Sequence, residues 1–232
     1  MRLAVIPARG GSKRIPRKNI KYFREKPIIA HSIQTLLKSN LFDKVIVSTD
    51  DTEIADVAKE YGAEVPFIRP KDISDDFATT GDVVKHAIEW YQSKGENIGV
   101  VCCLYATAPF VKCEDLINSL KVLETDDTEC VFSATEFSYP IFRSFALDCD
   151  YRPEMFWPEN FAKRSQDLPK AYHDAGMFYI AKPCVFTEGK PLFSEHSKVN
   201  LIPHYRVQDI DTLEDWKRAE LMYGALKSSG EI

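Results

Sequence analysis

A basic, glycine-containing segment follows the first apolar run of the chain and has the composition of a phosphate-binding loop. Residues 9–26 hold eight lysines and arginines but a single acid, Glu25, whereas the whole 232-residue chain has a net charge of −5. Gly10 and Gly11 allow backbone N–H groups to turn toward an anion, and basic side chains neutralise phosphate oxygens. Such local positive charge on an acidic protein favours a small polyphosphate over nucleic acid; a solvated basic loop is the alternative.

Two aspartates separated by one residue form a second candidate site near the end of the chain. Asp209 and Asp211 directly precede Thr212, which opens a helical pattern. On an extended strand, residues i and i+2 project from the same face, so the two carboxylates would lie side by side. Paired carboxylates suit Mg²⁺, which prefers a few carboxylates together with substrate phosphates. A solvated strand end followed by a helix cap is the alternative interpretation.

Short apolar runs that alternate with helical patterns predict the elements that would position both sites. Strands are predicted at residues 3–6, 44–48, 64–68, 99–105 and 130–135, and helices at 51–62, from about 84 to 95, 112–124 and 212–224. Asp50, three residues before Glu53, is expected to cap the first of these helices. The alternation predicts an α/β fold with a doubly wound, mainly parallel sheet and ligand sites beyond the carboxyl ends of its strands. The basic loop follows the first strand, where this rule expects it.

Length and composition fit a single α/β domain over residues 1–232. No apolar run approaches the roughly 20 residues of a membrane span, and the chain opens on a strand pattern rather than a signal peptide, so we expect a cytoplasmic protein without membrane partners. The six cysteines lack metal-ligand spacing and are expected to be free thiols, with the neighbours Cys102 and Cys103 on opposite faces of a strand. Residues 138–171 are rich in proline and aromatics. This excursion is predicted to pack against a second subunit, or alternatively to cover the chain's own sheet.

The two motifs resemble the signatures of the sugar-activating cytidylyltransferases, which make CMP-linked nonulosonic acids such as CMP-sialic acid. The basic loop fits neither the Walker A nor the dinucleotide-binding pattern. The resemblance rests on residues 8–13, Lys18-Asn19, residues 47–51 and the late aspartates, and it extends over nearly the full length. It implies a nucleotide-diphospho-sugar transferase-like fold, CTP as a substrate, Mg²⁺ as cofactor and a homodimer.

The resemblance also implies roles for individual residues. The nucleotide would be held by Ala8, Arg9, Gly10, Gly11, Ser12, Lys13, Lys18, Asn19, Arg69, Ala78 and Thr80. Asp209 and Asp211 would bind Mg²⁺. The anomeric hydroxyl of the sugar would attack the α-phosphorus of CTP, with Arg9, Lys13, Lys18 and Asp211 as the catalytic residues. The sequence does not determine which group takes the hydroxyl's proton, and Asp211 is the candidate.

Departures from the sialic-acid pattern concern the sugar. Tyr105 stands where the sialic-acid enzymes carry a glutamine, and residues 164–168 and 172–179 resemble the branch that acts on pseudaminic acid, a diamino nonulosonate of bacterial surface and flagellar glycans. Candidate sugar-binding residues are Tyr105, Arg164, Gln166, His173 and Asp174, with Lys163 or Arg164 as the cation for the sugar carboxylate, reaching across a dimer.

Several alternatives remain open at this stage. Tyr105 could pack at a strand end, and His173 could make a structural hydrogen bond. The same reaction could use sialic, legionaminic or ketodeoxyoctonic acid. A non-catalytic nucleotide-binding module is the alternative from another class, and it would have no need of the aspartate pair.

Overall fold

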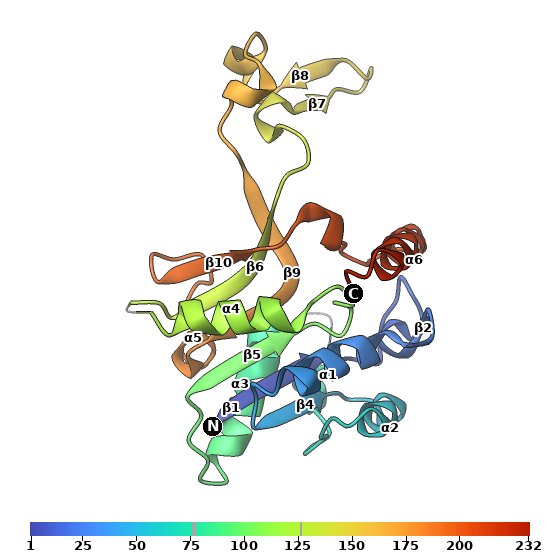
Figure 1. Ribbon diagram of the computed structural model, residues 1–232, viewed down its shortest axis with the longest axis vertical. Helices are drawn as coiled ribbons and strands as arrows, with labels where there is room; N and C mark the ends of the chain where they lie inside the picture. The colour runs from blue at the N-terminus through green and yellow to red at the C-terminus, as the bar shows by residue number, and fades with distance from the viewer. Residues whose placement is uncertain (76–77, 126) are drawn as a thin grey trace.

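A six-stranded sheet forms the centre of the computed structural model, which describes residues 1–75, 78–125 and 127–232 (Figure 1). The strand order is β10-β6-β9-β5-β1-β4. The bounds are β1 Arg2–Pro7, β4 Lys44–Ser48, β5 Val100–Leu104, β6 Cys130–Glu136, β9 Tyr172–Ala181 and β10 Ser197–Leu201. All pairings are parallel except those of β9, which runs antiparallel to β5 and β6. The predicted mainly parallel α/β sheet is therefore confirmed.

Helices cover both faces of this sheet because successive strand residues point to opposite sides. One core takes Ala4 and Cys102 from the strands and packs against α1 (Ile28–Ser39), α2 (Thr52–Glu60), α4 (Cys113–Leu123) and α6 (Leu213–Ser228). The other takes Val5 and Cys103 and packs against α3 (Thr80–Gln92) and α5 (Pro183–Thr187). Cys102 and Cys103 thus lie on opposite faces, as predicted.

Three details of the predicted elements are wrong. The side chain that caps α2 is Asp51, which accepts from the backbone N–H of Ile54 at 3.0 Å, whereas Asp50 is used elsewhere. Residues 64–68 form no strand beyond one bridge between Glu64 and Ile46, since Pro66 lacks the N–H that a ladder requires. The last helix does not stop at Gly224 but continues to Ser228.

Residues 138–171 stand away from the sheet on an extension of β6 and β9, at the top of Figure 1. This excursion contains the hairpin of β7 (Phe145–Leu147) and β8 (Pro153–Met155) and three single-turn helices, η3 (Ile141–Arg143), η4 (Pro158–Asn160) and η5 (Ser165–Asp167). Tyr139 and Phe161 are 83% and 70% exposed. The alternative that the excursion covers the chain's own sheet is therefore wrong.

The remaining short elements are η1 (Lys18–Ile20), β2 (Tyr22–Phe23), β3 (Lys26–Pro27), η2 (Lys71–Ile73) and η6 (His204–Arg206). All six cysteines are free thiols; Cys102, Cys103 and Cys130 are buried, and Cys149 in the excursion is exposed. Within the described ranges, no helix combines the length and the apolar character that crossing a bilayer requires.

Candidate active site

The basic loop leaves the carboxyl end of β1 and is held against the loop that follows β4. The backbone N–H of Gly10 donates to Asp50 Oδ1 at 3.0 Å, and the N–H of Ala8 donates to the Ser48 carbonyl at 3.0 Å. A Cβ at Gly10 would lie 2.6 Å from Asp51 Oδ2, so only glycine allows this approach. Gly10 therefore serves the close packing of two loops at the sheet edge.

Arg17 fixes the far end of the same loop. Its guanidinium donates to both carboxylate oxygens of Asp51, with Nη2 2.9 Å from Oδ1, and a second contact reaches Glu53. Arg17 adopts a left-handed backbone conformation with φ of 54°, which the bidentate pair compensates. The Arg17 guanidinium lowers the pKa of Asp51 to about 2. Asn19 completes the support by donating from Nδ2 to the Arg9 carbonyl at 2.9 Å.

A cavity of about 260 Å³ lies beside the loop and collects most of the predicted nucleotide-binding residues. Those that line it are Arg9, Ser12, Lys18, Asn19, Arg69, Ala78 and Thr80, together with Tyr105. Arg69 is 4% exposed, and its Nη2 lies 3.7 Å from Asp50 Oδ1. The predicted residues Ala8, Gly10, Gly11 and Lys13 belong to the same loop but not to the lining of this cavity.

The aspartate pair lies on the segment between η6 and α6 rather than on the expected strand. Residues 207–211 are extended but pair with no neighbouring strand. Asp211 is nevertheless close to the basic loop, since its Oδ1 is 2.9 Å from Arg14 Nη2 and 3.3 Å from Lys18 Nζ. Burial, followed by the charge of Asp211, raises the pKa of Asp209. The structure therefore joins the two predicted motifs into one site.

The two carboxylates fit a magnesium ion. Asp209 forms no ion pair within 4 Å among the described residues, and the charge of Lys18 does not offset the effect of burial and of Asp211, which together raise its pKa. The described residues contain no cluster of three or more acidic, histidine or cysteine ligands. A site of two carboxylates suits Mg²⁺, which takes further oxygens from phosphates and water, but not a structural zinc ion.

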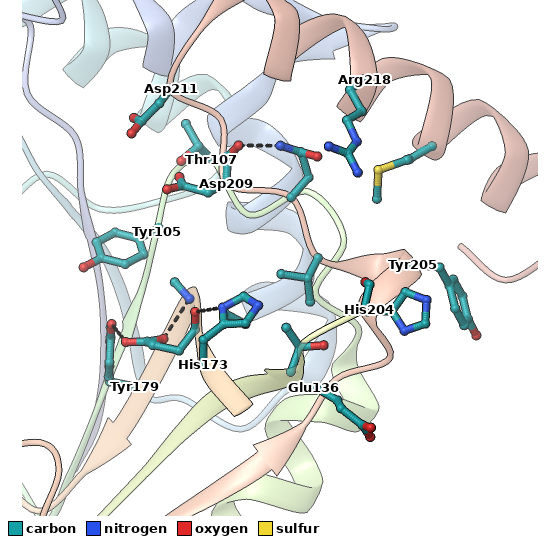
Figure 2. A pocket seen from close by; sticks show the side chains of 18 residues that line it. Tyr105, Thr107, Glu136, His173, Tyr179, His204, Tyr205, Asp209, Asp211 and Arg218 are labelled. Atoms are coloured by element: carbon teal, nitrogen blue, oxygen red, sulfur yellow. Dashed lines mark hydrogen bonds between the residues drawn. The ribbon is translucent and has the colours of Figure 1, made fainter. Parts of the chain in front are cut away.

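A second cavity of about 860 Å³ continues from the aspartates between β6, β9 and α6 (Figure 2). Tyr105 lines both cavities and therefore stands between the smaller cavity and the larger one. The predicted His173 and Asp174 line the larger cavity, whereas Arg164 and Gln166 lie in the excursion, where Arg164 pairs with Asp167 at 2.8 Å. A single chain thus brings together three of the five predicted sugar-binding residues.

An irregularity in β9 turns Asp174 into the larger cavity. On the β6 side, between the Phe132–Tyr179 and Ala134–Asp174 pairs, residues 175–178 of β9 stand opposite a single residue, Ser133, whose hydroxyl accepts from the N–H groups of Met177 and Phe178 at 3.2 Å each. Gly176 has φ of +61°, a conformation that other residues rarely adopt, and its N–H donates to Asp174 Oδ1 at 2.7 Å. Bulges commonly re-aim side chains beside active sites.

A line of hydroxyl groups crosses from one cavity to the other. The Tyr105 hydroxyl lies 3.0 Å from Thr80 Oγ1 in the wall of the smaller cavity, and Tyr179, which lines the larger cavity, donates to Asp174 Oδ2. The rings of Tyr105 and Tyr179 meet edge to face with centroids 6.0 Å apart. Burial raises the pKa of both phenols, so both remain protonated donors at neutral pH.

Sequence reasoning missed several lining residues, among them Thr107, Glu136, Tyr179, His204 and Arg218. His204 stands in none of the sequence motifs. Arg218 lies seven residues after Asp211 and one helical turn from Met222, which lines the same cavity. This spacing could have indicated that Arg218 faces the same cavity as the aspartates, because α6 begins directly after the aspartate pair.

Comparison with known proteins decides the family. The cytidylyltransferase family model matches residues 3–213. The chain belongs to the cytidylyltransferase family. Among its members, a pseudaminic acid cytidylyltransferase from Campylobacter jejuni is 47% identical over 221 residues, which cover 95% of each chain. A CMP-N,N'-diacetyllegionaminic acid synthase from Legionella pneumophila is 35% identical and covers 94% of each chain.

The cytidylyltransferase fold is also found in solved structures. A CMP:2-keto-3-deoxy-manno-octonic acid synthetase complexed with CTP superposes with a TM-score of 0.70, covering 97% of this chain and 98% of the other, at 15% identity. A 4-diphosphocytidyl-2C-methyl-D-erythritol synthase from Anaerococcus prevotii gives a TM-score of 0.64 at 14% identity. At such low identity these likenesses concern the fold alone.

Proposed function

We propose that this chain transfers CMP from CTP to the anomeric hydroxyl of pseudaminic acid and releases pyrophosphate. The observation that carries the proposal is 47% identity over 95% of both chains to a pseudaminic acid cytidylyltransferase. The geometry fits such a two-substrate transfer because a basic loop, an aspartate pair and a larger polar cavity meet at Tyr105. A non-catalytic nucleotide-binding module would not need the pair of aspartates beside the basic loop, which favours the enzyme over that alternative.

The proposed reaction is an in-line displacement at phosphorus. The anomeric oxygen forms a bond to the α-phosphorus while the bond from that phosphorus to the bridging oxygen breaks, and pyrophosphate leaves with the electron pair. Arg9, Lys13 and Lys18 would neutralise the charge that develops on the leaving group. The hydroxyl's proton has to be accepted close to the attacking oxygen, and Asp211 is our candidate acceptor.

Asp209 and Asp211 would hold the proposed Mg²⁺. The ion would supply positive charge to the phosphate oxygens. The chain's own contribution is to keep both carboxylates in place: the N–H of Asp211 donates to Asp215 Oδ2 at 3.2 Å, and Lys18 Nζ donates to the Ile210 carbonyl at 2.8 Å. These bonds anchor the segment at Ile210 and Asp211.

We further propose a homodimer formed through residues 138–171. The support is the exposure of aromatic side chains that this chain cannot cover itself: Tyr139, Tyr151, Phe156 and Phe161 are each at least 60% exposed. In such a dimer Arg164 and Gln166 of one subunit could approach the larger cavity of the other. Because the proposed reaction consumes CTP, we place the enzyme in the cytoplasm, in the synthesis of a bacterial surface or flagellar glycan.

The direct test is pyrophosphate release with CTP and Mg²⁺, measured separately with pseudaminic, legionaminic, sialic and ketodeoxyoctonic acids. Release with pseudaminic acid alone would support the reaction and the substrate together. Preference for another of the four acids would retain the chemistry but refute the assigned sugar. No release with any of them would favour the nucleotide-binding module.

A further inference from the structure

The larger cavity is lined by more acidic than basic side chains, and the carboxylate of the proposed substrate would add a further negative charge. Four acidic residues line it, namely Glu136, Asp174, Asp209 and Asp211, whereas Arg218 is the one arginine or lysine among its lining residues in the described part of the chain. A nonulosonic acid carries its carboxylate on the anomeric carbon, one bond from the hydroxyl that reacts. Arg14 and Lys18 of the basic loop already pair with Asp211, so binding that carboxylate calls for a further cation on the side of the larger cavity.

Arg218 is placed to meet this requirement. It reaches from α6 toward the cavity on the side of Asp209 and His204 (Figure 2). The Arg218 side chain is exposed, and its charge acts on Asp215, three residues earlier in α6. Among the described residues, no hydrogen bond or ion pair within 4 Å holds its guanidinium, which can therefore donate to a ligand. A guanidinium binds a carboxylate through two parallel hydrogen bonds, which fixes orientation as well as charge.

The backbone ties Arg218 to the reacting end of the site. Thr212 and Asp215 form a capping box at the start of α6, and Asp215 also accepts from the N–H of Asp211. Trp216 and Ala219 on either side of Arg218 are buried at 4% and 0% exposure, which fixes the rotation of the helix. The position of Arg218 relative to the aspartates is thus set within ten residues of sequence.

Arg164, the cation expected from sequence, is arranged differently. Its side chain is 73% exposed and already pairs with Asp167 on the same helical turn. It could reach a sugar only from a second subunit. Lys163 likewise donates to Asn160 within the excursion.

Resting on the proposed function, we infer that Arg218 is a specificity-determining residue that binds the carboxylate of the nonulosonic acid. The two parallel donors of its guanidinium would favour sugars that carry a carboxylate beside the anomeric hydroxyl over sugars that lack one. The remainder of the sugar would then contact the part of the cavity that is lined by Tyr105, Tyr179 and His173.

The test compares steady-state kinetics of the full-length enzyme, Arg218→Gln and the matched control Lys217→Gln, which alters an exposed neighbour outside the cavity. We expect KM for the acid to rise about 10- to 100-fold in Arg218→Gln with KM for CTP within about twofold of wild type. Arg218→Lys should recover part of the loss, since it keeps the charge but not the fork. Lys217→Gln should behave as wild type.

A substrate change makes the assignment specific. The C1 amide of the same acid should lose affinity for the wild-type enzyme, while Arg218→Gln should no longer distinguish the amide from the acid. Unchanged KM for the acid in Arg218→Gln, or an equal rise for acid and CTP, would overturn the inference, as would a comparable rise found only in Arg164→Gln. Failure of the wild-type enzyme on every acid would instead refute the proposed function.

Discussion

The hydroxyl groups of Thr80 and Tyr105 lie 3.0 Å apart, and this hydrogen bond joins the wall of the smaller cavity to the wall of the larger cavity. Thr80 is the first residue of α3, whose start is fixed by a capping box between Thr79 and Asp82. Tyr105 follows β5 directly. A change at Tyr105 should therefore affect how the two substrates are placed relative to each other.

Tyr105→Gln should change the sugar preference more than the CTP affinity. The phenol and the amide offer different donors and acceptors to the sugar, and an unpaired polar group in a closed site is costly. We expect the ratio of kcat/KM between pseudaminic and sialic acid to fall by about tenfold or more. Thr80→Val is the control, because it removes the hydrogen bond and leaves the tyrosine in place. An unchanged ratio would exclude Tyr105 from sugar selection.

Asp211→Asn should lower kcat by about 10²- to 10³-fold while leaving the fold intact. The loss follows from removal of a charge at the proposed metal and proton-transfer position. The pair with Arg14 is exposed and contributes little to stability, and asparagine can still accept from the partly buried Lys18. Calorimetric titration with Mg²⁺ in the presence of a non-hydrolysable CTP analogue should show weaker metal binding. Glu214→Gln, three residues further on, serves as the control. Mg²⁺-dependent turnover at the wild-type rate would remove Asp211 from the mechanism.

Arg206→Met should destabilise the protein by about 3–5 kcal/mol, because it leaves the Asp115 carboxylate buried without its partner. Arg206 and Asp115 are 6% and 7% exposed and form two hydrogen bonds of 2.9 Å. Urea unfolding followed by circular dichroism measures the change. Arg2→Met breaks an exposed ion pair with Glu124 and should cost less than about 1 kcal/mol. Equal effects of the two substitutions would contradict the role given to burial.

His31 should make the stability depend on pH between about 6.5 and 4. Burial, with a contribution from Lys26, lowers the pKa of His31 to about 4, while Nε2–H donates to the Phe23 carbonyl at 3.2 Å. In this range the unfolded chain binds a proton that the native chain does not, so the free energy of unfolding falls as the pH falls. The total effect is on the order of 3 kcal/mol.

The matched measurement uses His31→Gln and His196→Gln in urea unfolding at a series of pH values. His31→Gln should flatten the dependence between pH 6.5 and 4 even if it lowers stability at neutral pH. The half-exposed His196 should make no comparable difference. A wild-type slope that persists in His31→Gln would assign the dependence to other groups.

Paired substitution of Phe156 and Phe161 by serine should convert the proposed dimer into monomers. Their rings are 60% and 70% exposed in the single chain, and dimer formation would bury them. Sedimentation velocity should show a shift toward the 26.5 kDa of one chain. Leu221→Ser, which changes an exposed residue of α6 outside the excursion, should leave the mass unaltered. A wild-type protein that sediments as a monomer at micromolar concentration would refute this interface.

Local pattern predicted the elements that lie next to the chemistry. The apolar run of β4 was bounded correctly at Lys44–Ser48, and the Thr212 cap correctly marked the start of α6. The sequence did not reveal β9 as a strand, because Gly176 and the polar residues around it break the two-residue period. The bulge in β9 also depends on its contact with Ser133, which lies on another strand more than forty residues earlier in the chain.

The sequence predicted only part of the candidate site, because the rest depends on contacts between residues that are far apart in the chain. Lys18 and Asp211 could each be identified from its own sequence motif. The distance of 3.3 Å between Lys18 Nζ and Asp211 Oδ1, however, is created only when the sheet folds. Arg218 carries no motif and lines the cavity only after Trp216 has docked α6 against the core. The location of residues 138–171 away from the sheet also followed from tertiary structure, since composition alone allowed either arrangement.

The contact between Lys18 and Asp211 also has a consequence for the order of events during synthesis. It spans 193 residues, nearly the whole chain, and most of the central sheet is translated before Asp211 leaves the ribosome. A nascent chain can therefore assemble β1, β4 and β5 with the basic loop in place, yet it lacks the carboxylates that complete the site. On the roles proposed for Asp209 and Asp211, catalytic competence would be acquired only when the final helix docks, so incomplete polypeptides from interrupted translation would retain the basic loop without consuming CTP.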